Sequence, residues 1–300
     1  MDEPRTPGEG EPWTPILLTR WSGEYLEKMG VENGRLDAEL LLARVLEIRR
    51  LDLYLQHDRP LEQEELSRYR ALLKRRAARE PLQHILGTAA FRELELRADP
   101  RALVPRSETE VLVEEVLSWT REKGGFGAGE DMRALDVGTG TGAIALSLLA
   151  EGPFRRVVAT DLSEDALELA RENARTLHLE EGLELRAGSL FEPLEAGEGF
   201  HVVVSNPPYV PRGDEESLAP EVREWDPPVA LFAGREGLDV LLPLVEGAAA
   251  HLHPGGLLAL EVGAGQAGTV ARAMESTGEY REIRIRQDLA GRGRVVLGVA

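Results

Sequence analysis

Five short apolar segments separated by helical stretches dominate the chain from residue 133 to residue 262. The segments read RALDV, RVVATD, LELRAG, HVVVSN and GGLLALEV, and stretches such as GAIALSLLA and SEDALELARENARTLH lie between them. Nearly continuous apolar runs are typical of strands that are buried on both faces of a parallel sheet. The alternating order therefore predicts an α/β fold with a doubly wound parallel sheet.

The last segment, REIRIRQDLAGRGRVVLGV, contains two strand-like runs around an Ala-Gly-Arg-Gly sequence. Glycines between two such runs favour a tight turn. We expect a C-terminal antiparallel hairpin to close the sheet.

The part of the chain before residue 106 has a different pattern. Residues 1–15 are rich in Pro, Gly and Glu and are expected to lack fixed structure, while apolar residues three and four positions apart predict a small all-helical domain over 16–87. Residues 88–105 alternate between apolar and polar and predict a linker with short strands. The large α/β domain then spans 106–300, and its first helix begins where Ser107 and Glu110 have the spacing of a capping box.

Composition excludes several classes of protein. The 35 basic against 53 acidic residues give a net charge of −18, which disfavours DNA as a partner. The chain has no cysteine, and its six histidines show no metal-ligand spacing, so we expect neither a disulfide nor a metal. No apolar run is long enough for a membrane span, and no signal peptide is visible at the start, so a cytoplasmic location without membrane contact is expected.

The first strand of the sheet ends in a glycine-rich sequence, DVGTGTGA, with glycines at 138, 140 and 142. Such a turn at the carboxyl end of a strand lets the backbone touch a nucleotide-like ligand. Asp161 ends the next strand, where an acid can bind two ribose hydroxyls or can start the following helix together with Ser163. These residues leave open a nicotinamide cofactor, S-adenosylmethionine and a purely structural turn.

The fourth strand ends in Asn206-Pro207-Pro208-Tyr209, an unusual terminator for a buried strand. Two prolines stiffen the loop. The side-chain oxygen of Asn206 and the backbone carbonyl of Pro207 can then accept the two hydrogens of one NH₂ group, and Tyr209 can stack on a flat target. This arrangement suits methyl transfer from S-adenosylmethionine to a planar nitrogen, because orientation and desolvation raise the rate when the nitrogen is a poor nucleophile.

These motifs resemble those of class I S-adenosylmethionine-dependent methyltransferases with an Asn-Pro-Pro-Tyr sequence. More narrowly, the chain resembles the release factor glutamine methyltransferase family, also called HemK or PrmC. The resemblance covers EPLQHILG, VPRSETE, LDVGTGTGAIAL, SNPPYVP, ALFAGREGLD, LEVGAGQ and DLAGRGRVV. It implies a Rossmann-like catalytic domain, a helical substrate-recognition domain, and methylation of the glutamine in the Gly-Gly-Gln loop of peptide-chain release factors.

The resemblance also assigns roles to single residues. Asn206 and Pro207 are the implied catalytic residues, and the target amide lies on Asn206, Pro207, Pro208 and Tyr209. The implied cofactor contacts are Gly138, Thr139, Gly140, Thr141, Gly142, Asp161, Ser189, Leu190 and Asn206. At Ser189 and Leu190 the family usually has an acid and often an aromatic residue, so apolar contacts are expected to hold the adenine. Glu261 and Gln266 follow the fifth strand, where a place beside the pocket and a purely structural role both stay open.

Two other functions remain alternatives at this point. The Asn-Pro-Pro-Tyr loop identifies an NH₂ group rather than the molecule that carries it, so a nucleic-acid methyltransferase acting on adenine or guanine is one. A cofactor-binding interaction protein without activity is the other, because the sequence after the third strand departs from the family pattern.

Overall fold

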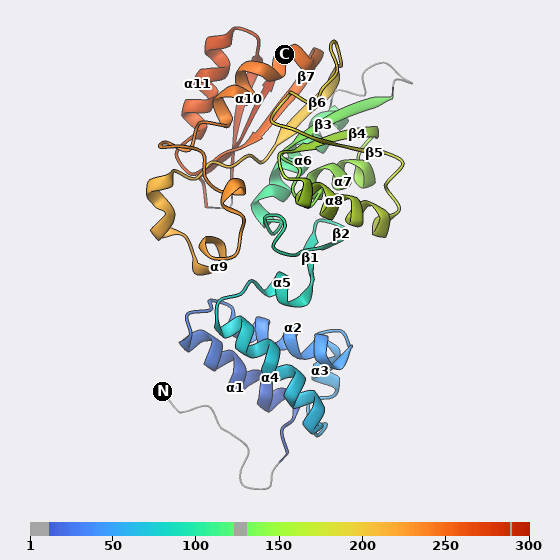
Figure 1. Ribbon diagram of the computed structural model, residues 1–300, viewed down its shortest axis with the longest axis vertical. Coiled ribbons are helices and arrows are strands. Elements are labelled where there is room, and N and C mark those ends of the chain that lie inside the picture. Colours follow the sequence, from blue (N-terminus) through green and yellow to red (C-terminus); the bar gives the residue numbers. More distant parts are fainter. Residues whose placement is uncertain (1–11, 123–130, 289) are drawn as a thin grey trace. The chain divides into compact units, whose positions relative to one another are not determined.

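A computed structural model describes residues 12–122, 131–288 and 290–300 (Figure 1). The chain forms two compact units, Met1–Gly87 with Pro220–Trp225, and Thr88–Ala219 with Asp226–Ala300. The expected tail falls outside the described residues up to position 11. Its last residue, Pro15, already begins the first helix, because proline fits the first position of a helix, where its missing N–H costs no hydrogen bond.

The first unit is a helical bundle around an apolar core. Its fully buried side chains include Leu26, Leu41, Leu42 and Tyr69, and the Tyr69 hydroxyl donates a hydrogen bond to the carbonyl of Ala38 at 3.3 Å. The helices of this unit's first segment are α1 (Pro15–Lys28), α2 (Gly34–Leu46), α3 (Asp52–Leu55), α4 (Gln63–Ala77) and α5 (Leu82–Leu86).

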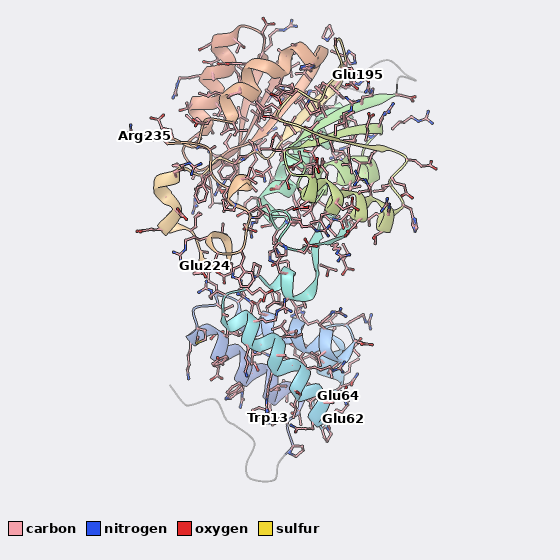
Figure 2. All side chains as sticks on the ribbon, in the orientation of Figure 1. Trp13, Glu62, Glu64, Glu195, Glu224 and Arg235 are labelled. Atoms are coloured by element: carbon pink, nitrogen blue, oxygen red, sulfur yellow. The ribbon has the colours of Figure 1, made fainter. Side chains whose placement is uncertain are left out.

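One end of this unit is held by hydrogen bonds before α4. The backbone N–H of Glu62 donates to Oε2 of Glu65 at 2.8 Å, which satisfies a donor at the start of the helix. The N–H of Leu61 donates to the carbonyl of Trp13 at 2.8 Å. Figure 2 shows Trp13 and Glu62 at this same end, so the segments before α1 and before α4 are joined there.

The segment Pro220–Trp225, which contains α9 (Pro220–Arg223), belongs to the helical unit through Glu221. The carboxylate of Glu221 accepts hydrogen bonds from Arg76 at 2.9 Å and from Arg79 at 2.6 and 2.7 Å. Arg76 is buried and also donates to Asp37 at 2.7 Å. Paired charges of this kind satisfy each other inside a core where an isolated charge is costly.

The second unit contains a seven-stranded sheet in the order β5-β4-β3-β6-β7-β9-β8. β3 to β7 pair in parallel, and β9 pairs antiparallel with both β7 and β8. The strands are β3 (Met132–Val137), β4 (Phe154–Asp161), β5 (Leu183–Ala187), β6 (Phe200–Ser205), β7 (Leu252–Glu261), β8 (Arg281–Gln287) and β9 (Gly293–Val299). The predicted parallel strands and the closing hairpin are confirmed.

Helices cover both faces of the sheet (Figure 1). On one face, side chains of α6 (Ser107–Glu122), α7 (Ala143–Glu151) and α8 (Glu164–Leu177) pack in one apolar cluster with the strands. On the other face, α10 (Leu241–Ala248) and α11 (Ala267–Thr277) pack in a second cluster. The layers explain why the central strands β3 and β6 are buried on both sides.

The remaining short elements connect these layers. A two-stranded hairpin, β1 (Thr88–Phe91) with β2 (Leu94–Arg97), packs its Phe91, Leu94 and Leu96 into the first cluster. The 3-10 turns within the described ranges are η1 (Arg212–Ser217), η2 (Pro228–Ala230) and η3 (Ala249–His251). Among the described residues, none of the helices combines the length and the apolar character needed to cross a membrane.

Candidate active site

A cavity of about 590 Å³ lies at the carboxyl ends of β3, β4, β5 and β6 in the second unit. The strand order turns back between β3 and β6, and doubly wound sheets bind their ligands at such a point. The volume is in the range of sites for small molecules and cofactors. The residues that were predicted from the sequence and that line this cavity are Gly138, Thr139, Gly140, Thr141, Asp161, Ser189, Leu190, Asn206, Pro207 and Pro208.

The glycine turn after β3 has a backbone that requires glycine. Gly138, Gly140 and Gly142 have φ angles of +74°, +56° and +84°, in the left-handed region that side chains disfavour. A Cβ on Gly138 would meet no atom within 4 Å, so the angle alone explains that glycine. A Cβ on Gly142 would lie 3.1 Å from Leu146 and 3.3 Å from Ala170, so this third glycine also permits close packing of α7 and α8.

The turn is tied to the strands beneath it. The N–H groups of Gly138 and Thr139 donate to the carbonyl of Thr160 at 2.8 and 3.0 Å. The Thr139 hydroxyl donates to Oδ2 of Asp136 at 2.7 Å. Burial raises the pKa of Asp136 to about 7, although hydrogen bonds from Thr139 and Ala145 oppose this shift. These hydrogen bonds tie the turn to β3 and β4.

Asp161 serves the turn and the cavity together. Its Oδ2 accepts the N–H of Gly140 and its Oδ1 accepts the N–H of Ser163, both at 2.9 Å. The cap of α8 is Ser163 itself, whose hydroxyl accepts the N–H of Ala166 at 3.2 Å. Burial raises the pKa of Asp161, and the backbone N–H groups lower it. Each carboxylate oxygen has a further lone pair, so Asp161 can still accept from hydroxyls in the cavity.

The opposite wall near β5 is largely apolar. Leu162 and Leu190 line the cavity together with Ser189. Leu190 has a φ of +49°, an uncommon angle for a residue with a side chain. This wall offers apolar contact to a ligand, and the adenine contact expected at Ser189 and Leu190 stays a prediction.

The Asn206 loop leaves a strand in which every residue is buried. The last strand residue, Ser205, donates its hydroxyl to the carbonyl of Val137 at 2.6 Å, which joins β6 to β3 at the cavity. The Asn206 side chain donates from Nδ2 to Oγ1 of Thr109 at 2.9 Å. Asn206, Pro207 and Pro208 all line the cavity. Their strand, β6, pairs directly with β3, the strand that leads into the glycine turn.

Tyr209 is held by Glu261, the last residue of β7, and by Gln266, which follows β7. Its hydroxyl donates to Oε1 of Glu261 at 3.2 Å, and its carbonyl accepts from Nε2 of Gln266 at 3.0 Å. Oε1 of Gln266 accepts the N–H of Gly263 at 2.8 Å, so Gln266 braces the loop. Burial and the Glu261 carboxylate raise the pKa of the Tyr209 phenol. Two of the predicted site residues, Gly142 and Tyr209, are not among the described residues that line the cavity.

Several cavity residues were not among the predicted site residues, although Val104 and Phe232 lie in segments that carry the family resemblance. They include Ala102, Leu103 and Val104 before α6, and Pro227, Pro228 and Phe232 after α9. Arg106 joins the two segments, because its Nη2 donates to the buried carboxylate of Asp226 at 2.5 Å. The VPR and DPP sequences punctuate these loops, but nothing local in them indicates that they meet.

The start of α6 differs from the predicted capping box. The helix begins at Ser107 as expected. However, the Glu110 carboxylate accepts the backbone N–H of Arg92 at 3.1 Å, and the Ser107 hydroxyl donates to Glu108 at 3.0 Å. Packing of the β1–β2 hairpin against the helix therefore redirects Glu110. Within the described part of the chain, no group of three or more His, Cys, Asp or Glu is placed to hold a metal ion.

Two family models match this chain. Residues 18–87 match the PrmC N-terminal domain, and residues 113–221 match the methyltransferase small domain. The first match coincides with the helical unit's first segment, and the second spans the glycine turn and the Asn206 loop.

Known proteins with similar sequences include release factor glutamine methyltransferases from several bacteria. A release factor glutamine methyltransferase of Geobacter sulfurreducens is 43% identical over 288 residues, which cover 96% of this chain and 97% of that protein. The release factor glutamine methyltransferase of Deinococcus radiodurans is 44% identical over 280 residues, which cover 93% of this chain and 96% of that protein.

Solved structures support the fold. A methyltransferase from Pyrococcus furiosus aligns with a TM-score of 0.51 at 20% identity, covering 70% of this chain and 90% of that one. The catalytic domain of hMettl16 aligns with a TM-score of 0.55 at 13% identity, covering 76% of this chain and 81% of that one. At these identities the likeness shows the methyltransferase fold alone. Because the sequence relatives are this similar over nearly their whole length, the chain belongs to the release factor glutamine methyltransferase family.

Proposed function

We propose that this protein transfers a methyl group from S-adenosylmethionine to the side-chain nitrogen of the glutamine in the Gly-Gly-Gln loop of peptide-chain release factors. The observation that carries the proposal is the position of Asn206 and Pro207 on the wall of the cavity that also contains the glycine turn and Asp161. One cavity then has room for a methyl donor and for the NH₂ group that accepts the methyl.

The residues present fit S-adenosylmethionine. The glycine turn brings backbone within reach of a ligand, Asp161 offers lone pairs for ribose hydroxyls, and Leu162 and Leu190 provide an apolar wall for adenine. When bound, the cofactor supplies an electrophilic methyl on a sulfonium. We assign its contacts to Gly138, Thr139, Gly140, Thr141, Asp161, Ser189, Leu190 and Asn206, with Gly142 shaping the turn from behind.

Asn206 and Pro207 act on the target amide. Oδ1 of Asn206 and the Pro207 carbonyl are two acceptors for the two hydrogens of one NH₂ group, so they orient its nitrogen. They also stabilise the positive charge that builds on this nitrogen during transfer. Pro208 stiffens the loop, and Tyr209 supports it from its site beside Glu261.

We further propose that residues 16–87 form the substrate-recognition domain and that 106–300 form the methyltransferase domain, connected by 88–105. A release factor held away from the reacting atom contributes binding energy that positions the glutamine. The enzyme is expected in the cytoplasm, where release factors are found, and without a resident metal.

The experiment uses isotopically labelled S-adenosylmethionine with full-length release factor, the same factor with the loop glutamine changed to alanine, and unmethylated DNA. Mass spectrometry then locates the label. Label confined to the loop glutamine supports the proposal, and a short Gly-Gly-Gln peptide should react much more slowly than the whole factor. Label on DNA alone would favour the adenine methyltransferase, and label on neither would favour a non-catalytic binding protein.

A further inference from the structure

The Asn206 side chain is held by a buried hydroxyl on another element. Its Nδ2 donates to Oγ1 of Thr109 at 2.9 Å, although the two residues are 97 positions apart in the chain. Thr109 lies in the first turn of α6 and is 4% exposed. A primary amide has a donor end and an acceptor end. With its nitrogen on Thr109, Asn206 leaves Oδ1 to the cavity.

The direction of this hydrogen bond depends on Glu261. Glu261 is 2% exposed; burial raises the pKa of its carboxylate, and the neighbouring Thr109 hydroxyl opposes this shift. An ionised carboxylate only accepts hydrogen bonds, so a Thr109 hydroxyl that turns its single hydrogen toward Glu261 keeps its lone pairs for Asn206. The same carboxylate accepts the Tyr209 hydroxyl at 3.2 Å. Glu261 therefore supports the Asn206–Tyr209 loop at two residues, at Tyr209 directly and at Asn206 through Thr109.

We propose that Thr109 and Glu261 are positioning residues that keep the Asn206 amide oxygen turned toward the target nitrogen, an inference that rests on the function proposed above. A reversed amide would present two N–H donors to the two N–H donors of the target. The reversed Asn206 amide repels the substrate's NH₂ group, whereas the native amide accepts a hydrogen bond from that group. Three elements meet to set this orientation, α6 through Thr109, β7 through Glu261 and the end of β6 through Asn206.

Three substitutions test this chain of hydrogen bonds. Thr109→Val keeps the shape and removes the hydroxyl, and kcat should fall by roughly 10-fold to 100-fold, the scale of lost positioning and charge stabilisation. Thr109→Ser keeps the hydroxyl and should stay within a few-fold of the native rate. Glu261→Gln replaces an acceptor by a group that can donate to Thr109, which frees the hydroxyl to turn toward Asn206, so kcat should fall at least as far as in Thr109→Val.

Matched controls separate positioning from folding. Thr120→Val removes another buried hydroxyl from the same helix, one that donates to the Leu117 carbonyl, and should leave kcat unchanged. Dissociation constants for S-adenosylmethionine should stay within about twofold of native for Thr109→Val, because the interaction acts on the target rather than the cofactor. In an Asn206→Ala background, Thr109→Val should have little further effect, because its partner is gone. Native turnover in Thr109→Val, or an undiminished loss in the Asn206→Ala background, would overturn the proposal.

A readout without turnover distinguishes this inference from the function itself. Nuclear Overhauser contacts between the Asn206 side-chain NH₂ and the Thr109 methyl group should be present in the native protein and lost in Glu261→Gln. Native protein with this contact but without release factor methylation would overturn the proposed function and keep only the orientation of the Asn206 amide by Thr109. Methylation without the contact would overturn the positioning role alone.

Discussion

The carboxylate of Asp161, at the end of β4, holds the glycine turn of the neighbouring strand, since its Oδ2 accepts the N–H of Gly140 at 2.9 Å. Asp161, which is predicted to bind the ribose, therefore also supports the glycine turn that lines the same cavity. We therefore expect loss of this side chain to weaken cofactor binding in two ways, by removing an acceptor and by loosening the turn.

Asp161→Ala should weaken S-adenosylmethionine binding by about 1 to 3 kcal/mol, the usual value of hydrogen bonds to a charged group. Isothermal titration calorimetry measures the change. Asp165→Ala removes an exposed carboxylate from the first turn of the following helix and serves as the control for lost charge. Equal affinities of native protein and Asp161→Ala would restrict Asp161 to a structural role.

Asn206→Ala should retain cofactor binding and lose most turnover, because the missing oxygen orients the target amide. A fall in kcat of roughly 100-fold or more is the expected scale. Single-turnover kinetics with full-length release factor and calorimetry with S-adenosylmethionine separate the two effects. The orienting role of Asn206 is wrong if turnover stays near the native rate.

Asp136→Asn should change how stability depends on pH. Burial raises the Asp136 pKa to about 7 in the folded protein, above its value of roughly 4 in the unfolded chain. Between these two values the folded state binds more protons than the unfolded state, so the native protein loses stability as pH rises through this window. Asn cannot ionise, so the variant should avoid this loss.

Urea unfolding at pH 5, 6, 7 and 8 measures this effect. The free energy of unfolding of Asp136→Asn should gain on that of the native protein with rising pH, by on the order of 1 kcal/mol or more at pH 8. Asp131→Asn changes an exposed carboxylate beside the same strand and is the control. Parallel curves for native protein and Asp136→Asn would contradict the prediction.

Gly142→Ala should destabilise the second unit by about 1 to 3 kcal/mol. The new alanine would have to adopt a φ of +84°, and its Cβ would press on Leu146 and Ala170. Gly265→Ala is a matched control, since φ is +88° there and a Cβ would meet no atom within 4 Å. Thermal unfolding should show a larger loss of stability for Gly142→Ala than for Gly265→Ala. Equal losses would mean that backbone strain, and not packing, accounts for Gly142.

Local sequence patterns were sufficient to predict the sheet and the chemical character of its loops. Apolar runs such as HVVVSN predicted strands because burial on both faces leaves no polar position, and glycines at 138 and 140 predicted a turn because their φ angles exclude side chains. The motif Asn206-Pro207 predicted an NH₂-binding loop because its acceptors are adjacent in the chain. These features depend on neighbours in sequence.

Contacts between distant residues were set by the folded structure and had no local signature. Thr109 reaches Asn206 across 97 positions, and Arg106 reaches Asp226 across 120, because α6 and the loops after β6 pack at one end of the sheet. For the same reason Glu110 bonds to Arg92 rather than closing the capping box that its spacing predicted. A hydrogen bond satisfies a donor wherever packing brings an acceptor near, and periodicity along the chain carries no information on which remote acceptor that will be.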